Sequence, residues 1–179
     1  MLTKDNTGLI VVDIQGKLAR LVHDSETLIA NSAKLIKGAQ VLGLPILWLE
    51  QNSEKLGPTV EELARLLEDQ QPIEKFTFDG CAEPSFMQAV RESNVETWLV
   101  CGIETHICVY QTASSLKHQG YEVQLVQDCV SSRTPENRQL GISKLHSHGV
   151  DLTGLEMCLY ELVKDCRKPE FKDILSLIK

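Results

Sequence analysis

Three residues along this chain have side chains that could each take part in chemistry: Asp13, Lys75 and Cys108. The cysteine lies in the segment VCGIETHICV (100–109), after a predicted strand, a glycine and a short turn. This places Cys108 in the first turn of a predicted helix, where free N–H groups and the helix dipole lower a thiol pKa and bind an oxyanion. The alternative is a small buried thiol that packs the helix onto a sheet, because buried cysteine is common.

The two charged candidates also follow predicted strands. Asp13 ends the apolar run LIVVD (9–13), where a carboxylate suits a base or a ribose partner, or else caps a turn. Lys75 lies in IEKFTFD (73–79), where its ammonium could stabilise charge in a cleft, or else stay solvated at a strand end. The role of each residue is ambiguous when the residue is considered alone, so it depends on the helices and strands that position the side chain.

Short apolar runs alternate with helical spacing along the whole chain. We predict strands at 9–14, 45–50, 73–76, 97–101, 122–126 and 150–153, and helices at 26–42, 59–68, 84–92, 105–119, 134–146, 154–164 and 170–178. Thr59 begins a predicted capping box, and Thr134 is a predicted N-cap before Pro135. This order indicates an α/β fold with a mainly parallel sheet of about six strands and helices on both faces. Ligands bind such sheets at the carboxyl ends of the strands.

Size and charge exclude several classes of protein. The chain has 179 residues and a net charge of −7, so we expect one domain over 1–179. Nucleic-acid binding and an anionic membrane surface are disfavoured, because both require basic residues. No apolar run approaches 18 residues and no signal-peptide pattern occurs, so we expect a cytoplasmic protein.

Cysteine and glycine patterns exclude further chemistry. The six cysteines are widely and unevenly spaced, without CxxC, so we expect free thiols rather than disulfides. The five histidines show no metal-ligand spacing, although His106 is close enough to Cys108 to line a pocket or else be exposed. GxGxxG, P-loop and GxSxG motifs are absent, which disfavours dinucleotide binding, nucleotide binding and serine-hydrolase activity.

Taken together, these segments resemble the isochorismatase-like superfamily of cysteine hydrolases over nearly the whole chain. The matching motifs are LIVVDIQ (9–15), IEK (73–75), and GIETHICV (102–109) followed by QTA (111–113). Glu50-Gln51, the phrase LGPT (56–59) and the phrase DCVSSR (128–133) point to the isochorismatase domain-containing branch. The resemblance implies a three-layer sandwich with the fold predicted above.

The resemblance also implies a mechanism. Asp13, Lys75 and Cys108 form a catalytic triad: the aspartate is the general base, the lysine holds it, and the thiolate attacks a carbonyl carbon. Backbone N–H groups of Glu104 and Cys108 bind the oxyanion, and relatives carry a cis peptide bond at the position of Ile103–Glu104. The implied activity is hydrolysis of a small-molecule C–N bond, in an amide or carbamoyl-like group, through a thioester.

Departures from relatives narrow the function. Nicotinamidases carry a metal motif where this chain has EQNSE (50–54), so we expect no metal and no other cofactor. True isochorismatases lack the cysteine that is present here, which disfavours isochorismate as substrate. Glu104 is larger and charged where amidases often have a small residue, so it either selects a polar or cationic group or points to solvent or a neighbouring subunit. Predicted pocket residues are Gln15, Gln51, Phe76, Phe78, Ile103 and Glu104.

Two other functions remain open: a non-catalytic interaction protein on the same fold, and a redox-reactive Cys108 that would need a resolving thiol such as Cys101. The expected partners are a small-molecule substrate and, by resemblance, further copies of the chain in a homo-oligomer. The predicted helix 170–178 would pack within the subunit or form an interface.

Overall fold

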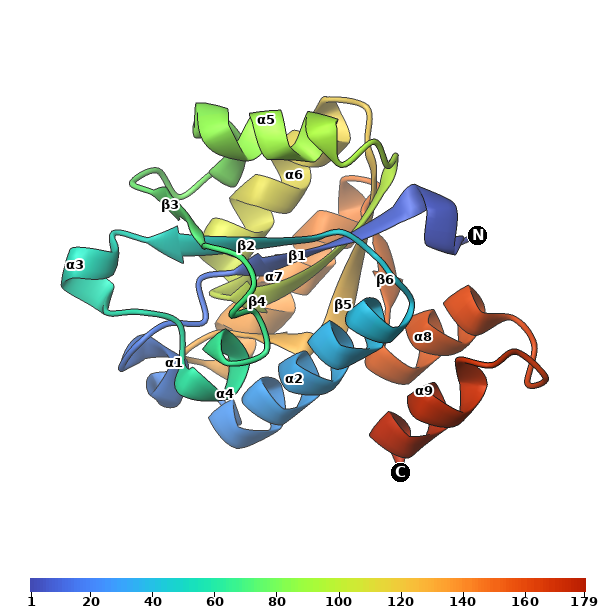
Figure 1. The fold of residues 1–179 in the computed structure, drawn as a ribbon. Coiled ribbons are helices and arrows are strands. Elements are labelled where there is room, and N and C mark those ends of the chain that lie inside the picture. Colours follow the sequence, from blue (N-terminus) through green and yellow to red (C-terminus); the bar gives the residue numbers. More distant parts are fainter.

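A six-stranded parallel sheet forms the centre of the molecule in a computed structural model that describes residues 1–179 (Figure 1). The strand order is β3-β2-β1-β4-β5-β6, and every neighbouring pair is parallel. The strands are β1 (Thr7–Val12), β2 (Ile46–Gln51), β3 (Ile73–Lys75), β4 (Thr97–Ile103), β5 (Glu122–Ser131) and β6 (Asp151–Thr153). The chain order reverses between β1 and β4, which is where open α/β sheets bind ligands.

Helices cover both faces of this sheet. The helices are α1 (Leu18–Leu21), α2 (Ser25–Val41), α3 (Ser53–Leu56), α4 (Glu61–Ala64), α5 (Pro84–Glu92), α6 (Tyr110–His118), α7 (Pro135–Ser147), α8 (Leu155–Val163) and α9 (Phe171–Ile178). One layer contains α2, α8 and α9, and the other contains α5, α6 and α7 (Figure 1). The predicted three-layer α/β sandwich is therefore confirmed. No helix has the length and apolar character needed to cross a membrane.

Two hydrophobic cores lie on opposite faces of the sheet, and β1 supplies both. All six residues of β1 are buried. Leu9 and Val11 belong to the core under α2, α8 and α9, whereas Ile10 and Val12 belong to the core under α5, α6 and α7. A strand buried on both faces has to be apolar at every position rather than alternating. The continuous LIVV run follows from this.

The predicted helix 59–68 is wrong in its start and its length. Helix α4 spans only Glu61–Ala64, and its N-cap is Val60. Thr59 does not cap it, because its backbone N–H and its hydroxyl both donate to Glu50 Oε1, at 2.7 and 2.8 Å, and the hydroxyl accepts from Trp48 Nε1. The Thr59 hydroxyl, which was predicted to cap the helix, therefore binds the buried Glu50 carboxylate on β2 instead.

Two glycines allow the backbones around the site to come close together. Gly102 has φ +128, and an added Cβ there would lie 2.1 Å from the carbonyl oxygen of Val12 on the adjacent strand. At Gly141 of α7, a Cβ would lie 2.8 Å from the carbonyl carbon and oxygen of Thr105. Helix α7 thus packs directly against the turn that follows β4, and any larger residue would displace that turn.

Candidate active site

Asp13 follows β1 in a left-handed backbone conformation. Its φ is 51°, a region that aspartate tolerates better than most residues. Its backbone N–H donates to the carbonyl of Leu49 at 3.2 Å, and its carbonyl accepts from Gln15 N at 2.9 Å. The turn leaves the carboxylate buried at the carboxyl end of the sheet. Burial raises the pKa of Asp13, although the Lys75 charge and hydrogen bonds from Lys75 and Cys108 lower it.

Lys75 ends β3 with a fully buried ammonium group. Its Nζ donates to Asp13 Oδ2 at 2.7 Å, to Gln51 Oε1 at 2.6 Å and to the Thr77 carbonyl at 3.2 Å. All three donors of the ammonium are thereby satisfied. A lysine is rarely fully buried unless it is paired, so this geometry distinguishes Lys75 from a solvated lysine at a strand end.

Two glutamines fix the lysine from behind. Gln15 Oε1 accepts from the Gln51 backbone N–H at 2.6 Å, and Gln15 Nε2 donates to the carbonyls of Gln51 and Gly57. Gln51 Nε2 donates to the Phe76 carbonyl at 2.8 Å, which turns its Oε1 toward Lys75. Through these contacts Gln15 holds Gln51 in place, and Gln51 in turn holds the Lys75 ammonium group in place.

Cys108 lies in a π-helical turn, Thr105–Val109, rather than in the first turn of an α-helix. Its Sγ is 4.0 Å from Gln51 Oε1, and Asp13 interacts with the same thiol. Burial raises the pKa of Cys108 to about 12, the Asp13 carboxylate adds to this, and Lys75 opposes it. The expectation of a lowered thiol pKa is therefore wrong for the free protein, because burial and Asp13 outweigh the cation. Ionisation of this thiol requires a base.

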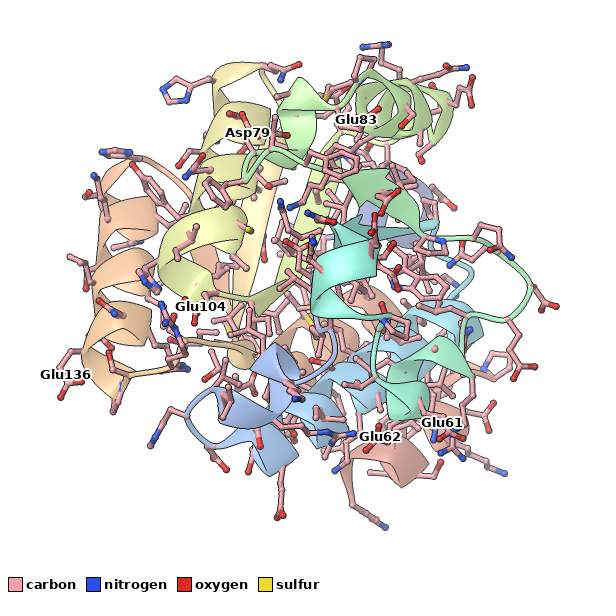
Figure 2. The ribbon with its side chains drawn as sticks, turned by 90° about the vertical axis from the view of Figure 1, so that its left-hand side faces the viewer. Glu61, Glu62, Asp79, Glu83, Glu104 and Glu136 are labelled. Carbon is pink, nitrogen blue, oxygen red and sulfur yellow. The ribbon has the colours of Figure 1, made fainter.

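Glu104 lies beside this turn, next to α7 (Figure 2). The peptide bond between Ile103 and Glu104 is cis. The Glu104 side chain is 4% exposed, its Oε1 accepts from Arg133 Nε at 2.7 Å, and its Oε2 is 3.7 Å from His106 Nε2. His106 Nδ1 in turn is 3.0 Å from Ser132 Oγ. Glu104 therefore faces its own protein partners, not solvent, and its backbone N–H donates to no protein acceptor.

A cavity of about 260 Å³ opens at Cys108. It is lined by Asp13, Leu18, Gln51, Leu56, Phe78, Ile103, Glu104, Ile107, Cys108 and Arg133. Of the predicted pocket residues, Gln51, Phe78, Ile103 and Glu104 line it. Gln15 is buried behind the wall, and Phe76 is 68% exposed outside it.

Four wall residues were missed from the sequence: Leu18, Leu56, Ile107 and Arg133. Leu56 and Arg133 belong to the phrases LGPT and DCVSSR, which carried the family resemblance, so a signal for them was present. Leu18 lies in a four-residue helix that was not predicted. Ile107 lies inside the predicted helix 105–119, in the part that forms the π-helical turn, where α-helical spacing does not indicate which side chains face a cavity.

The six cysteines lie in different parts of the fold. All six cysteines are free. Cys101, Cys129 and Cys158 lie together in the core under α2, α8 and α9, whereas Cys108 belongs to the core on the opposite face. The sheet therefore separates Cys101 from Cys108, which removes it as a resolving partner. The residues form no cluster of three or more potential metal ligands of the His, Cys, Asp or Glu type.

The fold and this site define an α/β protein with a buried aspartate, lysine and cysteine at the topological switch point. The chain belongs to the isochorismatase family, because the isochorismatase domain model matches residues 7–157. It is 33% identical over 177 residues to the secreted isochorismatase effector Isc1 of Phytophthora sojae, covering 96% of this chain and 83% of the relative. It is also 33% identical over 176 residues to mouse isochorismatase domain-containing protein 2A, covering 98% and 84%. These matches confirm the predicted branch.

One solved structure combines a similar fold with similar sequence. The structure of MAR1 ribonuclease from Caenorhabditis elegans has a TM-score of 0.93 and 32% identity, covering 99% of this chain and 91% of that chain. The similarity extends over the whole sheet and both helical layers.

Proposed function

We propose that this protein is a cysteine-dependent hydrolase of a C–N bond in a small molecule, an amide or a carbamoyl-like group. The observation that carries the proposal is the fully buried Lys75 ammonium, held by Asp13 at 2.7 Å beside the Cys108 thiol. A buried ion pair next to a thiol costs solvation energy, and replacement by apolar residues is often neutral or stabilising. Stability alone therefore gives little reason for such an arrangement, whereas nucleophile activation does.

In the proposed reaction, Asp13 takes the thiol proton as Cys108 Sγ attacks the carbonyl carbon. The oxyanion accepts hydrogen bonds from the backbone N–H groups of Glu104 and Cys108, where each donor contributes about 3–4 kcal/mol in comparable sites. The C–N bond then breaks, and the leaving nitrogen takes the proton from Asp13. An acyl thioester and a free amine, or ammonia, result.

Hydrolysis of the thioester uses the same base. Asp13 takes a proton from water as the water oxygen attacks the thioester carbonyl, the C–S bond breaks, and the thiolate regains the proton. The raised pKa of Asp13 suits both directions, because a carboxylate with an ordinary pKa is a weak base. Lys75 and Gln51 keep the carboxylate in position throughout, and no metal is required by this scheme.

The experiment that tests this function combines turnover with thiol labelling. Ammonia release is measured from a panel of small primary amides and carbamoyl compounds, and iodoacetamide labelling of all six cysteines is followed by peptide mass spectrometry. We expect release from at least one compound, lost when Cys108 is alkylated and spared when only the exposed Cys166 has reacted. Turnover that survives complete Cys108 alkylation would refute the mechanism.

The alternatives are separated by the same measurements. A non-catalytic interaction protein predicts no turnover and a Cys108 that reacts no faster than buried Cys129 or Cys158. A redox role predicts rapid sulfenic acid formation at Cys108, although its candidate resolving thiol lies across the sheet. The relative named a ribonuclease adds RNA as a test substrate; against it stand the net charge of −7 and a cavity of about 260 Å³.

Two further predictions accompany this function. We propose a homo-oligomer, supported by large apolar side chains on the surface, such as Leu21, Leu140 and Met157; sedimentation velocity tests it.

We also propose a cytoplasmic location, in keeping with six free cysteines, and fractionation of the source cells tests it.

A further inference from the structure

Most of the cavity at Cys108 is walled by apolar side chains. These belong to Leu18, Leu56, Phe78, Ile103 and Ile107, which come from four separate parts of the chain. At about 260 Å³ the cavity is smaller than the range of about 300–1,000 Å³ that drug-sized ligands occupy. The bound part of a substrate is therefore small, and most of its surface contacts carbon.

The charged groups in the wall are already paired within the protein. Asp13 is bound by Lys75 at 2.7 Å, and Glu104 is bound by Arg133 at 2.7 Å. The second oxygen of Glu104, Oε2, is closed off from solvent and lies 3.7 Å from His106 Nε2. An atom that water cannot reach does not face a ligand, so Glu104 does not offer its charge to the cavity. This argues against the cation selection that its sequence position suggested.

Arg133 is the one charged wall group with substantial exposure, at 58% of its side chain. Only its Nε makes a hydrogen bond, and the remaining guanidinium N–H groups have no acceptor within the protein. An anion bound there would gain little, because exposed ion pairs are weak in water, and the Glu104 carboxylate behind the guanidinium cancels most of its attraction. The other acidic residues on this side of the molecule, including Asp79 and Glu136, add negative potential (Figure 2).

We infer that the substrate of the proposed hydrolase is an uncharged primary amide or carbamoyl compound with a short apolar body, and that Glu104 determines this selectivity by neutralising Arg133. A charged group entering the cavity would lose its water and meet no unpaired counter-ion. A short alkyl group would instead be buried against five apolar side chains. The test of this inference by turnover rests on the proposed function. The test by binding, which we call the binding arm, does not.

The binding arm compares two reagents that differ in charge. Iodoacetamide and iodoacetate have the same leaving group and similar size, and the ratio of their rates cancels the thiolate fraction of each cysteine. The exposed Cys166 on the same chain supplies the reference ratio. We expect the iodoacetamide preference at Cys108 to exceed that at Cys166 by at least about tenfold. Iodoacetate that keeps pace at Cys108 would overturn the inference.

Charge variants identify the residue responsible. Glu104→Gln leaves Arg133 unpaired at the mouth, so the preference at Cys108 should fall at least fivefold. Arg133→Gln should strengthen the exclusion of iodoacetate. The double variant Glu104→Gln with Arg133→Gln is neutral again and should return to the wild-type preference. A double variant that behaves like Glu104→Gln alone would overturn the role of the pair. Thermal unfolding of each variant confirms that it is folded.

The turnover arm uses butyramide, succinamate and β-alaninamide, which are neutral, anionic and cationic. We expect kcat/KM for butyramide to exceed the other two by at least a hundredfold, and Glu104→Gln to raise kcat/KM for succinamate relative to butyramide. If no amide is hydrolysed but iodoacetate is still excluded, the proposed function fails and the neutral cavity stands. If succinamate or β-alaninamide is preferred, the neutral cavity fails and the hydrolase stands.

Discussion

Two ion pairs lie around the same cavity and differ in how much water reaches them. In both, the carboxylate side chain is 4% exposed, but the Lys75 side chain is 0% exposed and the Arg133 side chain is 58% exposed. Asp13 and Lys75 interact with the Cys108 thiol, and burial raises the pKa of both Asp13 and Cys108 while the Lys75 charge opposes this rise. Glu104 and Arg133 meet at the rim, where water screens the guanidinium.

This difference is the reason why we assign chemistry to the first pair and selection of the substrate to the second. A pair without water has a strong field and a carboxylate with a raised pKa, which proton transfer requires. A pair with one hydrated partner has a weaker field, because water screens it, and this fits the proposed role of selecting which charges enter the cavity. Lysine and arginine are not interchangeable in these places, because the compact ammonium fits among three acceptors whereas the planar guanidinium projects to solvent.

The largest effect is expected from removing the thiol that distinguishes the first pair. Cys108→Ala should abolish turnover, by on the order of 10⁴-fold or more, as nucleophile deletions do in other hydrolases. The fold should remain, because one sulfur is lost at the edge of a cavity. Ammonia release and thermal unfolding measure both. Cys166→Ala, at an exposed position, is the matched control and should retain full activity. Full activity in Cys108→Ala would show that the Asp13–Lys75 pair does not act through this thiol.

Asp13→Asn should separate turnover from thiol ionisation. The loss of the general base should lower kcat by about 10²–10⁴-fold. The Asp13 charge contributes to the raised pKa of Cys108, while Lys75 lowers it. Without the carboxylate the Cys108 pKa should fall, so iodoacetamide labelling at pH 8 should become faster while turnover becomes slower. Slower labelling in the variant would show that Asp13 acts on Cys108 in another way.

The stability of the two pairs should also differ when each cation is removed. Lys75→Met leaves a buried, unpaired Asp13, and breaking a buried pair in this way costs about 3–5 kcal/mol. Arg133→Met should cost less, about 1–2 kcal/mol, because water reaches the rim and can hydrate the remaining carboxylate. Urea unfolding gives both values. Equal losses would mean that the exposure of the cation does not separate the two pairs.

The smallest expected effect is the pH dependence of stability due to Asp13. Its pKa is raised in the folded protein, so the folded state holds this proton at pH values where the unfolded chain has released it. The contribution of Asp13 to the unfolding free energy therefore falls as pH rises from about 3.9 through the folded pKa, and is constant above it. Asp13→Asn should remove that slope in urea unfolding between pH 4 and 7. A slope that is unchanged in the variant would place its origin elsewhere.

Much of the fold could be predicted from the sequence, because apolar runs and caps are local signals. Helix α5 was predicted with the correct bounds, Pro84–Glu92, and Thr134 caps α7 through a hydrogen bond from Asn137 N. The failures lie where distant residues compete for a local group. Thr59 turned to Glu50 instead of capping a helix, and β5 extends five residues beyond its predicted end at 126 along β4.

The candidate site divides in the same way. The types of residue at 13, 75 and 108, and the positions of these residues after strands, were visible in the sequence, and the family resemblance assigned their roles. Three features required the structure: the raised pKa of Cys108, the burial of Glu104, and the place of Leu18 and Ile107 in the cavity wall. None has a local signal, because each depends on which side chains from elsewhere in the chain exclude water from a given atom.

The sequence by itself therefore determined the order of strands and helices and the set of reactive groups, since periodicity, caps and residue type act over a few positions. Only the tertiary structure decided which charges are paired, which thiol is buried beside a base, and which face of the sheet each cysteine occupies. Solvation and electrostatic energy depend on all atoms within several ångströms, whatever their distance along the chain. The parallel sheet brings residues 13, 51, 75 and 108 within that range.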